Sequence, residues 1–286
     1  DKPEIVKEQK SDDKDTTKLL LRLDDGSFIE TVCMHHVYGN SICVSTQVGC
    51  AMGCVFCAST QKGLERNLTA GEMLAQMFAF REVFDAPIHS LVLMGSGEPL
   101  QNYEEVLRFM RLCHDPELLN ISYRNMTLST CGIVPRIYRL ADEGLPVTLA
   151  ISLHAPNDEK RRELMPIANK YSIDELLAAC RNYFDKTGRR ITFEYSLVAG
   201  VNDSKENAQE LAGRLKGLNC HVNLIPVNPV RERSFVRSTR EAVENFKINL
   251  EKCGINVTIR REMGSDIDGA CGQLRKSYME KTESEK

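Results

Sequence analysis

The sequence lacks both a long apolar run and an excess of positive charge. No stretch approaches the roughly 20 apolar residues that a membrane-spanning helix needs, so no membrane contact is expected. Residues 1–16 are rich in charge and unlike a secretion signal, which favours a cytoplasmic location. The 37 Lys and Arg residues against 40 Asp and Glu residues give a net charge of −3. This balance excludes a strongly basic nucleic-acid-binding domain.

Cysteine, in contrast, is abundant, with 11 residues in a chain of 286. In a chain of this length without a visible signal, such a count indicates thiols that are kept reduced rather than a disulfide framework. The hydrophobic share of 42% is enough for a sizeable core, and the length suits one α/β barrel.

Short apolar runs alternate with helical patterns along most of the chain. The expected strands are residues 42–47, 90–94, 125–130, 147–153, 191–197 and 221–226, with 256–260 as a candidate seventh. The expected helices lie near residues 69–85, 102–113, 133–143, 172–186, 203–216 and 238–252. Six or seven βα units with near-continuous apolar strands predict a parallel sheet, either doubly wound or curled into a barrel.

The two ends of the chain read differently from this central pattern. Residues 1–16 are expected to form an exposed lead-in, followed by β-like runs at 18–23 and 27–34. The tail after Met279 is expected to be frayed.

The chemistry is concentrated in Cys50, Cys54 and Cys57, which follow the first expected strand with the spacing C-x3-C-x2-C. Three thiolates so close together suit a soft metal or an iron–sulfur cluster. A structural zinc site is the alternative, but it needs a fourth ligand, for which His35 and His36 are candidates. A cubane cluster held by three cysteines leaves one iron open to S-adenosylmethionine. The spacing resembles that of the radical S-adenosylmethionine (SAM) superfamily.

Polar residues follow the later strands in order, at the sheet edge where such folds place their chemistry. Each could be ordinary turn chemistry alone, but four in register with successive strand ends favour a cofactor site. The candidates for binding the cofactor are Gly97, Glu98, Ser129, Ser152, Leu153, His154 and Asn228.

Six segments together resemble the RlmN family of dual-specificity ribosomal and transfer RNA adenine C2-methyltransferases. They are CVSTQVGCAMGCVFCAS, RNLTAGEM, MGSGEPL, ISLHAPND, HVNLIPVNP and GSDIDGACGQLR. The likeness runs from about Ile5 to the C-terminus. The sister Cfr-type C8-methyltransferases share the cysteines, but Gly97-Glu98-Pro99 and residues 155–158 are more similar to the C2 enzymes. Family members usually carry a further N-terminal helical domain, which is expected to be absent here.

The resemblance implies a partial (β/α)6 radical SAM barrel with a short N-terminal β extension and a C-terminal catalytic loop. In this division residues 1–35 form the lead-in and hairpin, 36–262 the core barrel and 263–286 the C-terminal segment. It also implies a [4Fe-4S] cluster, two SAM molecules per turnover, and 23S rRNA and tRNA as substrates. The expected electron donor is flavodoxin or ferredoxin, and the expected state is a monomer.

Three further roles follow from the resemblance. Cys271, on a polar loop with three glycines, carries the methyl group. Cys43 resolves the protein–RNA adduct by attacking the sulfur of Cys271, and Glu30 accepts a proton. Strand alternation places Glu30 on an apolar face, where desolvation would poise it as a base. The remaining cysteines are interpreted as small buried hydrophobes, namely Cys33, Cys113, Cys131, Cys180, Cys220 and Cys253.

Two other functions remain open from the sequence. One is a non-catalytic RNA-binding protein with a structural metal. The other is a radical enzyme that acts on a small molecule or peptide, which would leave Cys43 and Cys271 without a role.

Overall fold

The computed structural model describes residues 2–84, 86–226, 236–261, 266–267 and 272–284. The chain divides into two compact units. Unit 1 comprises Asp1–Ala51, Cys57–Leu128 and Glu262–Lys286, and unit 2 comprises Met52–Phe56 and Ser129–Arg261.

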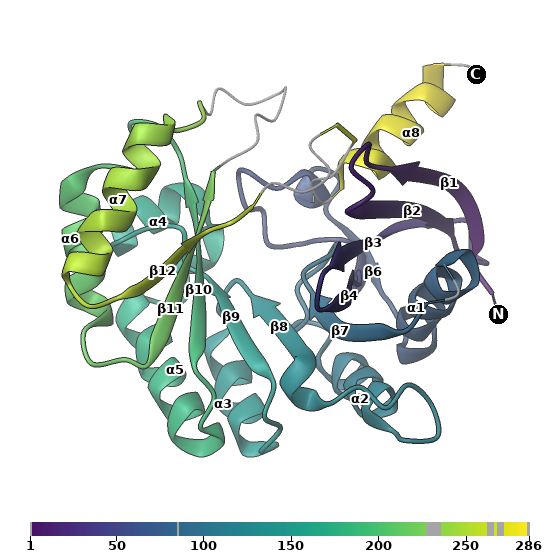
Figure 1. Cartoon of the computed structure of the whole chain (residues 1–286), viewed down its shortest axis with the longest axis horizontal. Helices are drawn as coiled ribbons and strands as arrows, with labels where there is room; N and C mark the ends of the chain where they lie inside the picture. Colours follow the sequence, from purple (N-terminus) through teal and green to yellow (C-terminus); the bar gives the residue numbers. More distant parts are fainter. Residues whose placement is uncertain (1, 85, 227–235, 262–265, 268–271, 285–286) are drawn as a thin grey trace. The chain divides into compact units, whose positions relative to one another are not determined.

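In unit 1, six paired strands change from antiparallel to parallel along the sheet (Figure 1). Their spatial order is β1 (Glu4–Lys10), β2 (Thr16–Arg22), β3 (Phe28–His36), β4 (Gly39–Cys43), β7 (Ile88–Leu93) and β8 (Met126–Thr130). The first four pair antiparallel, and β4, β7 and β8 pair parallel.

Unit 1 also holds a short hairpin and three helices. The hairpin pairs β5 (Gln47–Gly49) with β6 (Leu64–Asn67) and encloses the cysteines and the short 3-10 helix η1 (Ala58–Thr60). The helices are α1 (Ala70–Phe84), α2 (Tyr103–His114) and α8 (Gln273–Ser284), and α8 contacts β3 and η1.

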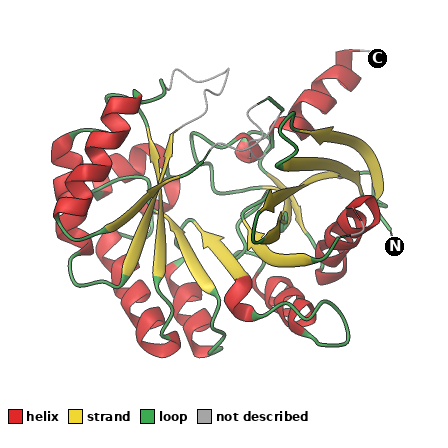
Figure 2. Ribbon diagram, in the orientation of Figure 1, coloured by secondary structure: helices red, strands yellow, loops and turns green. Residues whose placement is uncertain are grey.

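Unit 2 is a parallel βα array whose helices lie along its strands (Figure 2). The strands are β9 (Thr148–Ser152), β10 (Ile191–Leu197), β11 (Cys220–Pro226) and β12 (Asn256–Ile259), in that spatial order. The helices are α3 (Val134–Asp142), α4 (Asp158–Leu164), α5 (Ile173–Thr187), α6 (Lys205–Leu215) and α7 (Arg240–Lys252). Inward-facing apolar residues of β9 and β10, such as Ile151 and Phe193, are fully buried.

Local sequence signals explain where the helices begin and end. Ser172 and Glu175 form a capping box at the start of α5, which stops at Gly188 in the left-handed conformation, φ 65°. At α1 the Glu72 amide donates to Thr69 Oγ1 (3.2 Å), and the Thr69 amide donates to Glu72 Oε2 (2.9 Å). These two reciprocal hydrogen bonds form a capping box at the start of α1.

All six expected helices and seven expected central strands are present, within a few residues of the expected bounds. The prediction of an exposed lead-in for residues 1–16 is wrong, because residues 4–10 pair with β2 as strand β1. The first central strand ends at Cys43, earlier than expected, because residues 47–49 pair with β6 instead. The prediction of a frayed tail after Met279 is also wrong, since α8 continues to Ser284. Cys253 ends α7 on the surface, so it is not a buried hydrophobe.

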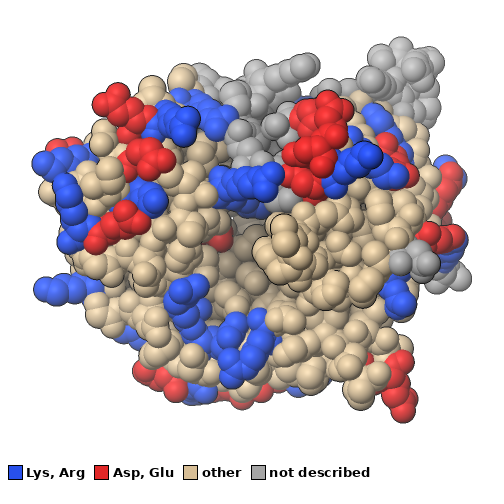
Figure 3. Space-filling model, in the orientation of Figure 1, with Lys and Arg blue, Asp and Glu red and all other residues tan. Residues whose placement is uncertain are grey.

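Among the helices of the described residues, none is both long and apolar enough to cross a membrane. Figure 3 shows Lys and Arg side chains interspersed with Asp and Glu over the face in view, as the net charge of −3 suggests.

Candidate functional site

The loop that carries the three spaced cysteines is closed at its base by the β5–β6 hairpin. The Cys50 amide donates to the Gly63 carbonyl at 2.9 Å. Gly49 has φ +76°, and a Cβ atom there would lie 2.1 Å from the Gly63 oxygen. Only glycine fits at position 49, because the neighbouring strand of the hairpin leaves no room for a side chain.

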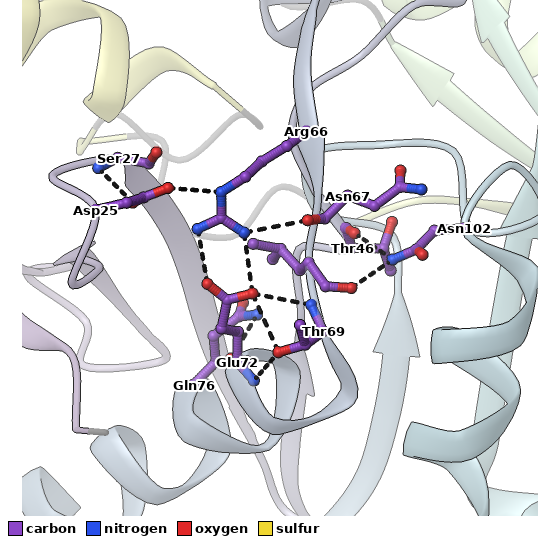
Figure 4. Close-up of polar contacts among 10 residues, drawn as sticks. Asp25, Ser27, Thr46, Arg66, Asn67, Thr69, Glu72, Gln76 and Asn102 are labelled. Carbon is purple, nitrogen blue, oxygen red and sulfur yellow. Dashed lines mark hydrogen bonds and ion pairs between the residues drawn. The ribbon is translucent and has the colours of Figure 1, made fainter.

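Arg66 on β6 fastens this hairpin to two other elements (Figure 4). Its Nη1 and Nη2 donate to the Glu72 carboxylate at 3.0 and 2.7 Å, and its Nε donates to Asp25 at 2.6 Å. The hydrogen bond from Arg66 holds the pKa of Asp25 well below its usual range. Burial would raise the pKa of Glu72, but hydrogen bonds from Arg66 and Thr69 lower it overall. The hairpin is thus tied to the β2–β3 turn and to the start of α1.

The chain after β4 lies against the chain after β7. Gly95 and Gly97 allow this approach, because a Cβ atom on Gly95 would lie 2.7 Å from the Ser45 amide nitrogen and one on Gly97 would lie 2.7 Å from Thr46 Oγ1. The Ser96 amide donates to Ser45 Oγ at 3.0 Å, and Ser45 Oγ donates to the Glu30 carbonyl at 2.7 Å. Ser45 therefore joins the chain segments after β4 and β7 to strand β3.

Glu98, a candidate cofactor-binding residue, is held rigidly in this segment. It is 3% exposed, its amide donates to Gln47 Oε1 at 2.8 Å, and its Oε1 accepts from the Leu100 amide at 3.0 Å. In the same segment, Thr46 Oγ1 is buried and has no hydrogen-bond partner among the described residues.

Glu30 lies in a buried cluster of donors that sequence reasoning missed. Lys18 Nζ is 3.0 Å from Glu30 Oε2, with the two side chains 0% and 4% exposed. The amides of Gly272 and Arg275 donate to Glu30 Oε2 and Oε1 at 2.7 and 2.6 Å. The surroundings expected for Glu30 are therefore wrong in one respect, because a lysine partner accompanies the apolar neighbours.

Cys43 ends β4 beside the same strand. It pairs with Val32 on β3, its carbonyl accepts from Thr31 Oγ1 at 2.9 Å, and its side chain is 8% exposed. Cys43 thus pairs with a residue of β3 that lies two positions after Glu30. Cys271 and Asn228 lie outside the described residues.

In unit 2, the segment Met52–Phe56 is seated on α4 and the turn after it. The Val55 amide donates to the Leu164 carbonyl at 3.0 Å. The rings of Phe56 and His154 meet edge to face with centroids 4.7 Å apart. Cys54, 9% exposed, is carried by this segment.

His154 follows β9 in a left-handed conformation, φ 57°, and is 4% exposed. Its Nδ1 accepts from the Ser196 amide at 2.9 Å, so the ring proton belongs on Nε2. Burial, followed by repulsion from Arg161, lowers the pKa of His154 to about 3. The ring is therefore a neutral hydrogen-bond donor at physiological pH.

The other expected residues of unit 2 lie at the carboxyl ends of β8 and β9. Ser129 and Ser152 are half-buried, and Leu153 is buried with its amide donating to the Glu194 carbonyl at 3.0 Å. Burial raises the pKa of Glu194, against the opposing effects of Arg260 and a hydrogen bond from Asn223. Glu194 was not expected from the sequence, because it lies inside the largely buried strand β10.

The donor set of the cysteine loop suits an iron–sulfur cluster. Cys50 and Cys54 are buried, Cys57 is half-buried, and the ten described cysteines form no disulfide with one another. Among the described residues, no three His, Cys, Asp or Glu side chains are already grouped as a metal site. Soft thiols on one glycine-bounded loop nevertheless match cluster ligands better than the oxygen ligands of hard cations.

Comparison with known proteins assigns the fold and the family. Residues 44–212 match the family model described as Radical SAM superfamily. A solved radical SAM methyltransferase from Sphaerobacter thermophilus is 50% identical, with a TM-score of 0.91 over 95% of this chain and 80% of that one. A Clostridium perfringens protein named "Probable dual-specificity RNA methyltransferase RlmN" is 57% identical over 97% of this chain and 80% of its own length. The chain belongs to the RlmN family. A Clostridium botulinum RlmN relative is 58% identical over 99% of this chain and 81% of that protein.

Membership of the RlmN family confirms the predicted radical SAM fold and the predicted enzyme class, a radical SAM methyltransferase. The family implies a [4Fe-4S] cluster and SAM as cofactors.

Proposed function

We propose that this RlmN-family chain methylates C2 of adenosine in RNA, with 23S rRNA at the peptidyl-transferase centre and tRNA just 3′ of the anticodon as substrates. Cys50, Cys54 and Cys57 would hold the cluster. Gly97, Glu98, Ser129, Ser152, Leu153, His154 and Asn228 would bind SAM. When bound, the cluster supplies the electron that cleaves SAM to the 5′-deoxyadenosyl radical.

Identity of 57% and 58% to relatives named dual-specificity RNA methyltransferases, over nearly the whole chain, is the main support for this function. Two SAM molecules per turnover, a flavodoxin or ferredoxin as electron donor, and a monomeric state belong to the same proposal.

The chemistry requires two thiols because C2 is an electron-poor ring carbon that cannot attack a sulfonium methyl. The Cys271 thiolate instead takes the methyl group from one SAM by displacement. After one hydrogen atom is removed from that methyl group, the carbon radical would add to C2, and the adduct would return one electron to the bound cluster, which leaves the protein joined to the RNA. The Cys43 thiolate then attacks the Cys271 sulfur, forms a disulfide and releases the methylated base.

Glu30 is the proposed acceptor of the proton that C2 loses. Three donors already point at its carboxylate, namely Lys18 and the amides of Gly272 and Arg275. A carboxylate has about four acceptor directions, so one remains for the proton.

The deciding experiment is mass spectrometry of RNA treated with the reduced, cluster-loaded protein and SAM. We expect 2-methyladenosine in a 23S rRNA fragment and in tRNA, and none with Cys54→Ala. Formation of 8-methyladenosine would identify a Cfr-type enzyme instead. SAM cleavage without RNA methylation would favour a radical enzyme acting on another substrate.

A further inference from the structure

Lys18 is fully buried in the middle of β2, where its side chain has no exposed surface. Burying an ammonium group costs several kcal/mol unless a partner compensates, and replacing a buried ion pair with apolar residues is often neutral or stabilising. The Lys18–Glu30 pair, at 3.0 Å, is therefore poorly explained by stability alone. The geometry of the pair indicates that it orients a neighbouring element of the fold.

The element that the pair orients is the start of α8. The first amides of a helix have no partner within the helix, and an anion near them is stabilised by the helix dipole. The first turn of α8 contains no acidic residue of its own. Glu30, which lies on β3, provides the negative charge instead. Its carboxylate accepts hydrogen bonds from the amides of Gly272 and Arg275 at 2.7 and 2.6 Å.

Gly272 is held on its other side by η1, the short helix that follows Cys57. Gly272 has φ +79°, and a Cβ atom there would lie 2.9 Å from both the amide nitrogen and Oγ of Ser59. The Arg275 side chain also pairs with Glu65 on β6. The start of α8 is thus fixed between the Glu30 carboxylate and the hairpin that closes the cysteine loop.

We propose that Lys18 is a positioning residue, which fixes the Glu30 carboxylate so that Gly272 is held against the segment following Cys57. Gly272 is the sequence neighbour of Cys271, so the catalytic consequence rests on the proposed function. Glu30 thereby has two tasks, proton acceptance and anchorage of α8. Lys18 acts only through Glu30 and touches no reacting atom.

The expected consequence of losing Lys18 is uncoupling of two products. Lys18→Met should keep the cluster, because Lys18 lies in β2 whereas the three cysteines lie on the loop between β5 and β6. It should still form 5′-deoxyadenosine, but the yield of 2-methyladenosine per 5′-deoxyadenosine should fall at least tenfold. Lys18→Arg, which keeps the cation, should recover part of this ratio.

The test combines that ratio with hydrogen exchange at the amides of Gly272 and Arg275, measured without SAM or RNA. We expect slow exchange in the wild type, at least tenfold faster exchange in Lys18→Met and partial recovery in Lys18→Arg. Lys2→Met is the matched control, because Lys2 forms an exposed ion pair with Glu82 at 2.6 Å. It should change neither readout.

Three outcomes would overturn the positioning role. These are an unchanged product ratio and unchanged exchange in Lys18→Met, a parallel loss of cluster, 5′-deoxyadenosine and methylation, or fast exchange of both amides in the wild type. The last measurement needs no variant, so it decides even if Lys18→Met does not fold. A wild type that anchors α8 but makes no methylated adenine would instead contradict the proposed function.

Discussion

Arg161 donates a hydrogen bond from Nη2 to the carbonyl of Cys131 at 2.6 Å, although its side chain is fully buried. Its Nε donates to the Leu153 carbonyl at 3.3 Å, so one guanidinium group joins the loops that follow β8 and β9. Gly132 has φ +102°, which favours glycine, and a Cβ atom there would lie 3.0 Å from Leu176 Cδ1 and 3.3 Å from Nη2. The Nη1 atom is buried without a hydrogen-bond partner in the described part of the chain.

Arg161→Met should therefore destabilise the fold strongly, because it removes the hydrogen bonds that Arg161 donates to two carbonyls. Loss of one such buried hydrogen bond costs about 1–3 kcal/mol, so for two we expect a loss of about 2–6 kcal/mol in the free energy of unfolding. Denaturant unfolding measures this loss. Arg162→Met is the control, since Arg162 is exposed on the same helix. Equal effects of the two substitutions would contradict the structural role of Arg161.

His154 should make the protein sensitive to mild acid. Its pKa in the folded state is about 3, lowered by burial and then by Arg161, whereas an unfolded histidine titrates near 6.5. At a pH between these two pKa values, the histidine is protonated in the unfolded chain but not in the folded chain. Stability from this group is therefore complete above about pH 6.5 and is lost as pH falls towards 3.

His154→Asn tests this effect, because asparagine tolerates the left-handed backbone and can place an acceptor where Nδ1 lies. We expect the variant to be less stable than the wild type at pH 7. The gap should narrow as pH falls from 6.5 to 4, as followed by denaturant unfolding. Parallel pH curves for the two proteins would contradict a neutral, buried His154.

Most of the βα order could be predicted from the sequence, because parallel strands with both faces covered leave continuous apolar runs between amphipathic helices. The Thr69–Glu72 capping box was predictable because a threonine followed three residues later by a glutamate is a local sequence signal. Strand β1 was missed because only Ile5 and Val6 among its seven residues are apolar, and only pairing with β2 shows that they form a strand.

The candidate site divides in the same way. The spacing of Cys50, Cys54 and Cys57 is a local signal and was predictable. The contact between Glu30 and Gly272 joins residues 242 positions apart, and no local pattern encodes such a pair. Lys18 was missed for a related reason, because a lysine in a strand usually indicates an exposed edge. Only the placement of Glu30 beside it explains its burial.

Arg66→Met should weaken the protein at neutral pH more than in acid. Arg66 contributes to the lowered pKa values of Asp25 and Glu72, so its contribution is present above about pH 4 and is lost as those carboxylates are protonated. These groups are partly exposed, so solvent screening limits the effect to about 1 kcal/mol. Thermal unfolding at pH 7 and pH 3 checks the difference, which should shrink in acid. A gap that stays constant would show that Arg66 acts only by packing.

Cys43 offers the sharpest separation of a mechanistic thiol from a structural one. If Cys43 only resolves the adduct, Cys43→Ala should form the protein–RNA bond and stop there. The reduced variant, incubated with SAM and substrate RNA, should carry an RNA fragment that resists denaturant. Because that bond runs through Cys271, the fragment should disappear when Cys271→Ala is added. Cys113→Ala is the matched control, since Cys113 is buried against Met77 with its Sγ 3.6 Å from Sδ. Truncating a core cysteine should lower stability and trap no RNA. A Cys43→Ala protein that holds its cluster and cleaves SAM, yet accumulates no adduct, would show that another group releases the methylated base.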